Sequence, residues 1–593
     1  MYRAPVDEIA FTLKSVCDLQ DLQQQPDYAE LSDDLLDAIL NEAGRFASEE
    51  IAPLNAIADK HGTPLENGVV STPPGWRDLY HNWISGGWNG LTASPDHGGQ
   101  GLPQMLAAAA MEMWNSGSMA FAIGPTLTIG AIEALEKHAS EELKAKYLDK
   151  LVSGEWTGTM NLTEPQAGSD LNALKAKAER ADDGTYRISG QKIYITYGEH
   201  DMTDNIIHLV LARLPDAPPG TKGISLFLVP KFLVNDDGSL GARNDVRCTG
   251  VEHKMGIHGS PTCTMVYGDD GGAIGWLVGE ENRGLVCMFT MMNNARLAVG
   301  IQGLGVAERA TQEAQAYALD RKQGQVPGQQ EKGMISIAHH PDIKRSLLGM
   351  RTRTQIARSI CYSCAHAIDM SHAITDPEKK KFWTERAGLL TPIAKALSTD
   401  FGVEVASLGI QIHGGMGYVE ETGAAQHLRD ARIAPIYEGT NGIQAIDLVM
   451  RKLPLSDGGH VEAFINELRE IVREVAASNR PEFGDTAEQL SAALDELETA
   501  TEWMLTAQKD GRVSEALSGA TPYLRLMGLA YGGVLLAKGA VRSDIENRAA
   551  RTQRTIMARS FAATLLNETS SLKHDVIGSA DTILSFDPEV LAS

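Results

Sequence analysis

The sequence predicts a mainly α-helical protein with one β domain. Apolar residues recur at helical spacing up to about residue 157, and short alternating runs replace them between about 175 and 280. Helical spacing then returns from about 284 onward and continues to the end of the chain. Because 593 residues are too many for one hydrophobic core, several domains are expected.

The N-terminal part is predicted to be helical. Residues 1–40 form a short helical extension, and residues 41–157 form the first helical domain. The run Leu-Ser-Asp-Asp at 31–34 supplies a helix start with a serine or aspartate cap, and apolar spacing continues through Phe46 and Ile51.

Residues 158–283 are predicted to form the β domain. Short β-branched or aromatic runs lie at 185–189, 206–211, 223–229 and 264–267. Gly, Pro and Asp turns separate these runs, which favours a small antiparallel sheet.

The rest of the chain is predicted to form two helical domains. Residues 284–455 have amphipathic spacing and few prolines, which is typical of a helical bundle. Residues 456–593 form a further helical domain, which we expect to support assembly. Its clearest helices lie near 460–479, 485–508 and 549–570.

The net charge of −24 at pH 7 argues against nucleic acid or an anionic membrane surface as the main partner. It does not exclude coenzyme A, because a few local cations suffice for its phosphates. The N-terminus lacks the pattern of a signal peptide, and the most apolar segment, 526–536, is short for a membrane span and broken by glycines. We therefore expect a cytoplasmic protein with no membrane partner.

Three local patterns have alternative interpretations. Cys361 and Cys364 spell C-x-x-C, but they lie in a helical stretch without a second ligand pair, so two core residues are favoured over a metal site. The glycines of 300–305 resemble a dinucleotide fingerprint, yet no strand precedes them, which favours helix packing. The arginines of 542–559 could line a solvated or subunit-facing helix, which we favour, or a DNA-binding surface.

Glu438 is the most informative residue. It lies in the stretch Ala-Pro-Ile-Tyr-Glu-Gly-Thr at 434–440, between apolar residues and a glycine turn. Burial there should raise its pKa, because desolvation disfavours the charged carboxylate, and such a group suits proton abstraction near neutral pH. Alone, however, a glutamate before a glycine is more often a solvated helix end.

A second motif belongs with this stretch: Met-Asn-Leu-Thr-Glu-Pro-Gln-Ala-Gly-Ser-Asp at 160–170. Together the two resemble the signatures of the flavin-dependent acyl-CoA dehydrogenases. The resemblance extends to Lys-Ile-Tyr-Ile-Thr at 192–196, Ala-Leu-Asp-Arg-Lys at 318–322 and Gln-Ile-His-Gly-Gly-Met-Gly at 411–417. It implies a helical N-terminal domain, a middle β-barrel domain and a four-helix bundle, with an extra C-terminal helical domain that only larger members carry.

The resemblance also implies FAD as cofactor, an acyl-CoA substrate and a role for each matching position. Glu438 would be the catalytic base. Ser169, Asn293, Arg296 and Gly439 would meet the substrate. The positions that would bind FAD are Met160, Leu162, Thr163, Tyr194, Ile195, Thr196, Arg321, Gln411, Gly414, Gly415, Thr440 and Asn441.

Two departures from the family pattern concern single positions. Many members have tryptophan where Tyr194 stands and aspartate where Asn293 stands. Some members place the base just before an arginine on an upstream helix, but that position is Ala295 here and cannot be a base. Its absence favours Glu438.

In the family, the pyrophosphate-binding parts cross over from a neighbouring subunit, so a homodimer or a dimer of dimers is expected. Electron-transferring flavoprotein is the acceptor that the family implies. The length, the N-terminal extension and the run at 252–263 resemble one subgroup, the 3-methylmercaptopropionyl-CoA dehydrogenases of bacterial sulfur metabolism, in dimethylsulfoniopropionate demethylation.

Alternatives remain at this point. The substrate could be a short-, medium- or long-chain fatty acyl-CoA. An acyl-CoA oxidase would share the base and the flavin site but pass electrons to oxygen. A flavin-bearing DNA-binding protein of the alkylation-response type has this fold too, although the acidic C-terminal block weighs against it.

Overall fold

The computed structural model describes residues 2–326, 328, 333–543 and 547–592, apart from the side chains of 291–293 and 591–592. The chain folds into two compact units. Unit 1 comprises Met1–Gly44, Gln104–Ser116 and Arg296–Ser593, and unit 2 comprises Arg45–Pro103 and Gly117–Ala295.

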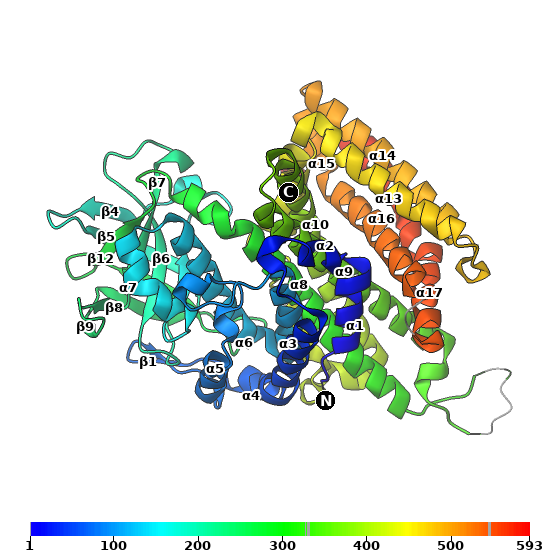
Figure 1. Ribbon diagram of the computed structural model, residues 1–593, viewed down its shortest axis with the longest axis horizontal. Coiled ribbons are helices and arrows are strands. Elements are labelled where there is room, and N and C mark those ends of the chain that lie inside the picture. The colour runs from blue at the N-terminus through cyan, green and yellow to red at the C-terminus, as the bar shows by residue number, and fades with distance from the viewer. Residues whose placement is uncertain (1, 327, 329–332, 544–546, 593) are drawn as a thin grey trace. The chain divides into compact units, whose positions relative to one another are not determined.

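An eight-stranded sheet is the centre of unit 2 (Figure 1). Its main path runs β10-β11-β5-β12-β7-β6-β3, and β4 pairs with β5 and β6. Neighbours on this path are antiparallel except for β3 and β6, which are parallel. The strands are β3 (Thr157–Asn161), β4 (Lys177–Arg180), β5 (Tyr186–Thr196), β6 (Ile206–Arg213), β7 (Ile224–Pro230), β10 (Val246–Val251), β11 (Thr262–Tyr267) and β12 (Ala273–Val278).

Helices and small hairpins complete unit 2. The strand pairs are β1 (Leu65–Glu66) with β2 (Val69–Val70), and β8 (Phe232–Val234) with β9 (Leu240–Arg243). Its longer helical parts are α4 (Asn55–His61), α5 (Trp76–Ser85), α7 (Glu141–Val152), the second half of α6 (Gln104–His138) and the start of α8 (Gly284–Asp320), up to residue 295.

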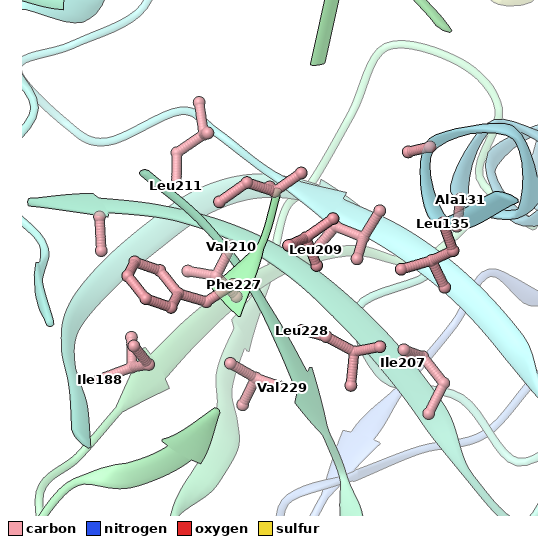
Figure 2. Close-up of a cluster of buried hydrophobic side chains, with 14 of the residues drawn as sticks. Ala131, Leu135, Ile188, Ile207, Leu209, Val210, Leu211, Phe227, Leu228 and Val229 are labelled. Atoms are coloured by element: carbon pink, nitrogen blue, oxygen red, sulfur yellow. The ribbon is translucent and has the colours of Figure 1, made fainter. Parts of the chain in front are cut away.

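The core of unit 2 lies between the sheet and helices α6 and α7. Ala131 and Leu135 on α6 belong to one buried cluster with Ile207, Leu209 and residues of β7 (Figure 2). Both β6 and β7 are apolar along nearly their whole length and almost entirely buried, which is typical of central strands covered on both faces.

Unit 1 is helical. Its long helices α8 (Gly284–Asp320, from residue 296), α9 (Pro341–Ala373) and α10 (Pro377–His413) form a bundle, and α9 and α10 pack along each other. Further helices are α1 (Val6–Phe11), α2 (Leu19–Gln23), most of α3 (Asp33–Phe46), α11 (Ala424–Ala431), α12 (Asn441–Asp447), α13 (Gly459–Ala477), α14 (Thr486–Lys509), α15 (Val513–Ser518), α16 (Ala520–Val541), α17 (Arg548–Ala563), α18 (Glu568–Gly578) and α19 (Ala580–Ser585).

The glycines of the fingerprint-like run serve helix packing, as predicted. A Cβ added to Gly300 would lie 2.5 Å from the carbonyl oxygen of Ala394, and one added to Gly303 would lie 2.5 Å from that of Ser398. Since both glycines belong to α8 and both carbonyls to α10, any side chain there would separate the two helices.

The N-terminal segment packs on the C-terminal helices of the same unit. Glu8 pairs with Arg554 at 2.7 Å, and Asp18 pairs with Lys538 at 2.6 Å and with Arg542 at 2.5 Å. Two members of the predicted arginine cluster therefore face the chain's own N-terminal helices. Neither forms a free basic surface.

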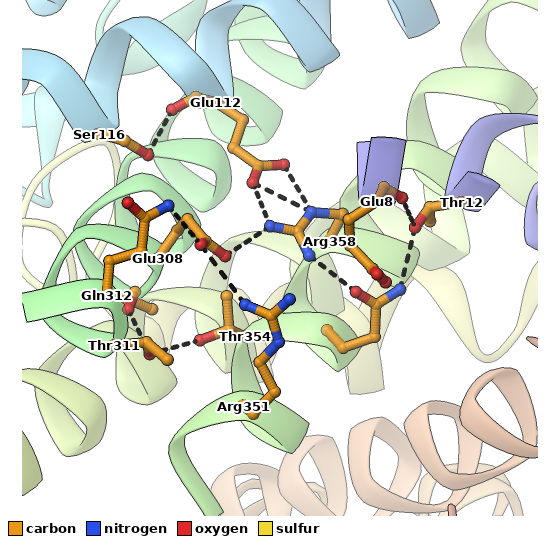
Figure 3. Close-up of polar contacts among 12 residues, drawn as sticks. Glu8, Thr12, Glu112, Ser116, Glu308, Thr311, Gln312, Arg351, Thr354 and Arg358 are labelled. Carbon is orange, nitrogen blue, oxygen red and sulfur yellow. Dashed lines mark hydrogen bonds and ion pairs between the residues drawn. The ribbon is translucent and has the colours of Figure 1, made fainter. Parts of the chain in front are cut away.

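A buried ion cluster joins three helices of the bundle core (Figure 3). Arg358 on α9 donates to Glu112 on α6 at 2.5 Å and to Glu308 on α8 at 2.8 Å, and all three side chains are essentially inaccessible to solvent. The two flanking carboxylates raise the pKa of Arg358, although burial opposes them. The cluster pins the first half of α6 to the bundle.

Among the described residues, α6 and α16 are long and apolar enough to cross a membrane, judged by length and composition alone, and the bent helix α8 would be a third if it counted as one span. In the fold, 72% of the apolar window of α6 and 89% of that of α16 are buried against the rest of the chain. The apolar segment noted at 526–536 is thus the middle of α16, a core helix of the C-terminal domain.

The predicted fold class is confirmed, with local differences. The four predicted strand runs coincide with β5, β6, β7 and β11, whereas β3, β4, β10 and β12 were not separately predicted. The helix expected at 549–570 is in fact two, because Thr564 has φ −126° and ψ −86° and ends α17. Cys361 and Cys364 are buried core residues of α9, as favoured.

Candidate active site

In unit 2, the end of strand β3 and a bend in strand β5 bring two predicted segments together. The N–H of Ile193 donates to the carbonyl of Thr163 at 2.9 Å, and the hydroxyl of Thr159 donates to the carbonyl of Thr196 at 2.7 Å. The predicted flavin contacts of 160–163 and 194–196 are therefore neighbours.

Tyr194 lies where β5 departs from regular pairing. The register with β11 shifts between Cys263 and Met265, and Tyr194 has φ +60°. A left-handed residue at such a shift turns its side chain away from the sheet. Tyr194 is 60% exposed, whereas its neighbour Ile195 is buried in the core. The bend thus presents a flat aromatic ring at the surface of unit 2.

Glu164, which sequence reasoning left without a role, anchors this loop. Its Oε1 accepts from the ammonium of Lys192 at 2.8 Å and from the N–H of Ala176 at 3.0 Å, and its Oε2 accepts from the N–H of Lys175 at 2.7 Å. Despite burial, Lys192 keeps the pKa of Glu164 below its usual value, and burial lowers that of Lys192 to about 8. In the sequence, this pair was visible as a Glu and a Lys inside two of the motifs that resemble the family.

The remaining predicted positions of unit 2 are more open. Met160, Leu162 and Thr163 are half-buried, and Ser169 is exposed in the loop after β3. Asp170 next to it accepts from the N–H of Asn172 at 2.9 Å and starts a short helical turn. The side chain of Asn293 lies outside the described residues.

In unit 1, Glu438 lies in the loop between α11 and α12. Its φ is +52° and that of Gly439 is +83°. Few non-glycine residues adopt such a conformation, and those that do are often functional. Glycine suits position 439, because side chains rarely adopt its φ and a Cβ there would lie 2.8 Å from the side-chain amide nitrogen of Gln444. Thr440 caps α12 by accepting from the N–H of Ile443 at 3.2 Å.

The carboxylate of Glu438 is half-buried, and among the described residues it has neither a hydrogen bond nor an ion pair. Burial raises its pKa, while the positive charges of Lys395 and Arg296 pull it back. A carboxylate that has a raised pKa and no hydrogen-bond partner can accept a proton near neutral pH.

Arg296 and Asn441, both predicted to contact ligands, use their side chains inside unit 1. Arg296 is buried and pairs with Asp447 at 2.5 Å. The amide of Asn441 bonds to Lys395 at 2.9 Å and to Asp400 at 2.7 Å, both on α10. A contact of Asn441 with a cofactor would therefore use its backbone, because its side chain is already occupied.

The predicted pyrophosphate residues of unit 1 lie at one end of two helices. The rings of Tyr317 on α8 and His413 on α10 are 4.4 Å apart. Arg321 follows Tyr317 by one turn and is exposed, and Gly414, Gly415 and Gln411 surround His413 in the sequence and are exposed as well. A Cβ on either glycine would meet nothing within 4 Å, so their backbone is accessible.

These features suit FAD. An exposed tyrosine ring beside a polar strand end can pack on an isoalloxazine ring. An exposed arginine and two exposed glycines with open space beside their backbone suit a pyrophosphate, which prefers a planar, bidentate donor and close backbone approach.

Comparison with known proteins identifies the family. The chain matches the acyl-CoA dehydrogenase N-terminal domain over 34–155, the middle domain over 159–269 and the C-terminal domain over 282–453, and a domain described as acetyl-CoA dehydrogenase C-terminal like over 460–587. It is 42% identical to the 3-methylmercaptopropionyl-CoA dehydrogenase of Ruegeria pomeroyi, over 98% of this chain and 99% of that protein. The chain belongs to the acyl-CoA dehydrogenase family.

Two further relatives agree with this assignment. A butyryl-CoA dehydrogenase of Syntrophomonas wolfei is 34% identical over 86% of this chain and 84% of its own length. The crystal structure of an acyl-CoA dehydrogenase complexed with FAD from Bacillus anthracis aligns with a TM-score of 0.74 at 21% identity, covering 100% of this chain and 94% of that one. The last comparison supports the fold.

This acyl-CoA dehydrogenase is an FAD-dependent oxidoreductase that acts on the CH–CH group of acyl-CoA thioesters. The predicted family, cofactor and substrate class are confirmed.

Proposed function

We propose that the enzyme oxidises 3-methylmercaptopropionyl-CoA to methylthioacryloyl-CoA, with Glu438 as the catalytic base. The observation that carries the choice of base is the Glu438 carboxylate: half-buried, without a partner among the described residues, and held on a left-handed loop. The full-length similarity to a 3-methylmercaptopropionyl-CoA dehydrogenase supports the choice of substrate.

Glu438 removes a proton from the α-carbon of the thioester. Negative charge then develops on the thioester oxygen, and a donor in a dry site stabilises such a charge by roughly 3–4 kcal/mol. The N–H of Glu438 is the donor that this chain offers. FAD, when bound, accepts the hydride that leaves the β-carbon. The α-proton stays on Glu438 until it is released to solvent.

The remaining predicted residues hold the ligands. In unit 2, Met160, Leu162, Thr163 and the segment from Tyr194 to Thr196 would pack on the flavin ring, and Ser169 would meet the substrate. In unit 1, Gly439 and Arg296 would border the thioester. Asn293, which precedes Arg296 by three residues in α8 and is assigned to unit 2, would also meet the substrate. Arg321, Gln411, Gly414 and Gly415 would bind the pyrophosphate, and Thr440 and the backbone of Asn441 the adenine half.

The exposed position of Arg321 and Gly414–Gly415 supports a shared cofactor site in a homodimer, which could pair into a dimer of dimers. Electron-transferring flavoprotein would be the electron acceptor, and the product would enter dimethylsulfoniopropionate demethylation in the cytoplasm. The C-terminal domain would support assembly.

A fatty acyl-CoA dehydrogenase activity is the second candidate, favoured by the similarity to a butyryl-CoA dehydrogenase. Pentanoyl-CoA separates the two, because it replaces the thioether sulfur by a methylene and keeps the chain length. A pocket distinguishes such groups by roughly 1–3 kcal/mol, about 10- to 200-fold in kcat/KM.

The test is therefore the ratio of kcat/KM for 3-methylmercaptopropionyl-CoA to that for pentanoyl-CoA, with butyryl- and octanoyl-CoA alongside. A ratio of about ten or more supports the thioether substrate, and a ratio at or below one assigns a fatty acyl-CoA. Steady peroxide formation without an added acceptor would indicate an oxidase. Retention on DNA without turnover of any acyl-CoA would indicate the alkylation-response type.

A further inference from the structure

A lysine without solvent access lies behind the loop of Glu438. Lys395, in the middle of α10, has 0% exposure. Its ammonium group donates to Oδ1 of Asn441 at 2.9 Å, and Asn441 follows Glu438 by three residues. Burying an ammonium group costs free energy unless the group is hydrogen-bonded and lies near an opposite charge. A lysine buried beside this loop is therefore a candidate for a functional role.

Asn441 is held by α10 from several sides. Its Nδ2 donates to Oδ1 of Asp400 at 2.7 Å, to the hydroxyl of Thr399 at 3.0 Å and to the carbonyl of Ala396 at 3.1 Å. With Lys395 on its oxygen, the amide uses both its donors and its acceptor within one helix. The side chain has one permitted orientation as a result.

The loop is closed around this amide. The N–H of Asn441 donates to the carbonyl of Pro435 at 3.0 Å, so residues 435–441 form a closed turn. From α12, the side-chain amide of Gln444 donates to the carbonyl of Glu438 at 3.2 Å and to that of Gly439 at 3.3 Å, both within this turn. Fixing Asn441 therefore fixes the left-handed backbone of Glu438.

Charge connects the same residues. Burial lowers the pKa of Lys395 to about 7, although Asp400 and Glu438 both act to raise it. Burial raises the pKa of Glu438, and Lys395 is the larger of the two charges that oppose this. The other charged or titratable groups around the pair are Arg296 on α8, Tyr437 beside Glu438, and Glu404 and Arg525 around Asp400.

We propose that Lys395 is a positioning residue for the base: its ammonium group fixes the Glu438 loop through Asn441, and its positive charge keeps the Glu438 carboxylate ionised for proton abstraction. The inference rests on the proposed function of Glu438. It assigns to α10, which carries no residue predicted to touch the reacting atoms, control over the state of the base.

The test uses FAD-loaded enzyme with the neutral variants Lys395→Met and Lys395→Gln and the charge-keeping variant Lys395→Arg. The rate of anaerobic flavin reduction by a saturating acyl-CoA is measured from pH 5.5 to 9.5. Loss of a nearby cation raises the pKa of a carboxyl, so both neutral variants should move the acid limb of the profile upward by about one pH unit. Lys395→Arg, which keeps the positive charge, should leave the acid limb close to its wild-type position.

Lys538→Met is the matched control. Lys538 is also a buried lysine with a carboxylate partner, Asp18 at 2.6 Å, but it belongs to α16. Lys538→Met should lower thermal stability, as we expect of Lys395→Met, and its pH profile should match that of the wild-type enzyme. A merely structural role of Lys395 would make the two variants behave alike.

Three outcomes separate the possibilities. An upward shift in the neutral variants alone supports the proposal. An unchanged acid limb in folded Lys395→Gln, with Glu438→Gln inactive, overturns it and leaves the proposed function intact. Flavin reduction that survives Glu438→Gln overturns the proposed function itself. Should Lys395→Met not fold, Lys395→Gln decides, because glutamine can still donate to Asn441 without a charge.

Discussion

Lys192 donates to Glu164 across 2.8 Å, and both side chains are almost completely buried. This ion pair joins strand β5 to the loop that follows strand β3. Both segments contribute predicted flavin contacts, Thr163 on one and Tyr194 on the other. We therefore expect the arrangement of the predicted flavin contacts in unit 2 to depend on two buried residues that were not themselves predicted to contact a ligand.

Breaking this pair should damage stability and cofactor binding together. Lys192→Met leaves the Glu164 carboxylate buried without its countercharge, which should lower the free energy of unfolding by about 3–5 kcal/mol. Urea unfolding and the flavin-to-protein absorbance ratio measure both effects. The control is Lys150→Met, which removes an exposed pair with Glu155 and should cost about 0–1 kcal/mol with full flavin content.

The buried cluster around Arg358 gives the corresponding prediction for unit 1. Arg358→Met would leave Glu112 without its countercharge and Glu308 with Arg351 at 3.6 Å, at a cost of about 3–5 kcal/mol in unfolding free energy. Arg473→Met, which removes an exposed pair with Glu470, should change it by about 0–1 kcal/mol. Equal losses in the two variants would mean that the cluster adds nothing beyond a surface ion pair.

Stability should fall in mild acid because of buried neutral histidines. Burial lowers the pKa of His208 from 6.5 to about 3, and the same holds for His200. Between these two pKa values the unfolded chain binds a proton that the folded protein does not bind. The contribution of each histidine to the free energy of unfolding is therefore fully present above pH 6.5 and is lost as the pH falls toward 3. Each histidine contributes a slope of about 1.4 kcal/mol per pH unit below pH 6. Urea unfolding at pH 4.5–7.5 should show that the free energy of unfolding depends less steeply on pH in His208→Gln than in the wild type. An identical dependence would refute the assignment.

The N-terminal segment should stabilise the C-terminal helices. Glu8→Ala would remove the carboxylate that pairs with buried Arg554, and deleting residues 1–24 would remove Asp18 as well. We expect faster hydrogen exchange in α16 and α17 in both variants, with the larger effect in the deletion, and unchanged exchange in the sheet of unit 2. Uniform protection in the deletion variant would show that the segment is dispensable.

The fold could be predicted from the sequence because apolar residues keep one regular spacing over long segments. Helical spacing on both sides of an alternating block identified the β domain, and the motif resemblance supplied the order of domains. Strand β3 escaped separate prediction because it is only five residues long and ends in the Thr163 motif. The break at Thr564 is invisible in composition, since it depends on packing in the C-terminal domain.

The candidate site was predictable as a set of positions but not as a set of contacts. The motif marked Asn441 as a ligand contact, yet its amide bonds to Lys395 and Asp400 on a helix, 46 and 41 residues earlier in the chain. Glu164 lay within the motif and Lys192 within another, and only the fold shows that they pair. Long-range partners of this kind leave no local signal in one sequence.

The central claim is that Glu438 abstracts the α-proton, and anaerobic bleaching of the bound flavin tests it most directly. Wild-type enzyme and Glu438→Gln are mixed with 3-methylmercaptopropionyl-CoA, and the flavin absorbance is followed with time. We expect rapid bleaching in the wild type and a rate lower by about 10²–10⁴-fold in the variant, at equal flavin content. Bleaching at the wild-type rate in Glu438→Gln would contradict the account.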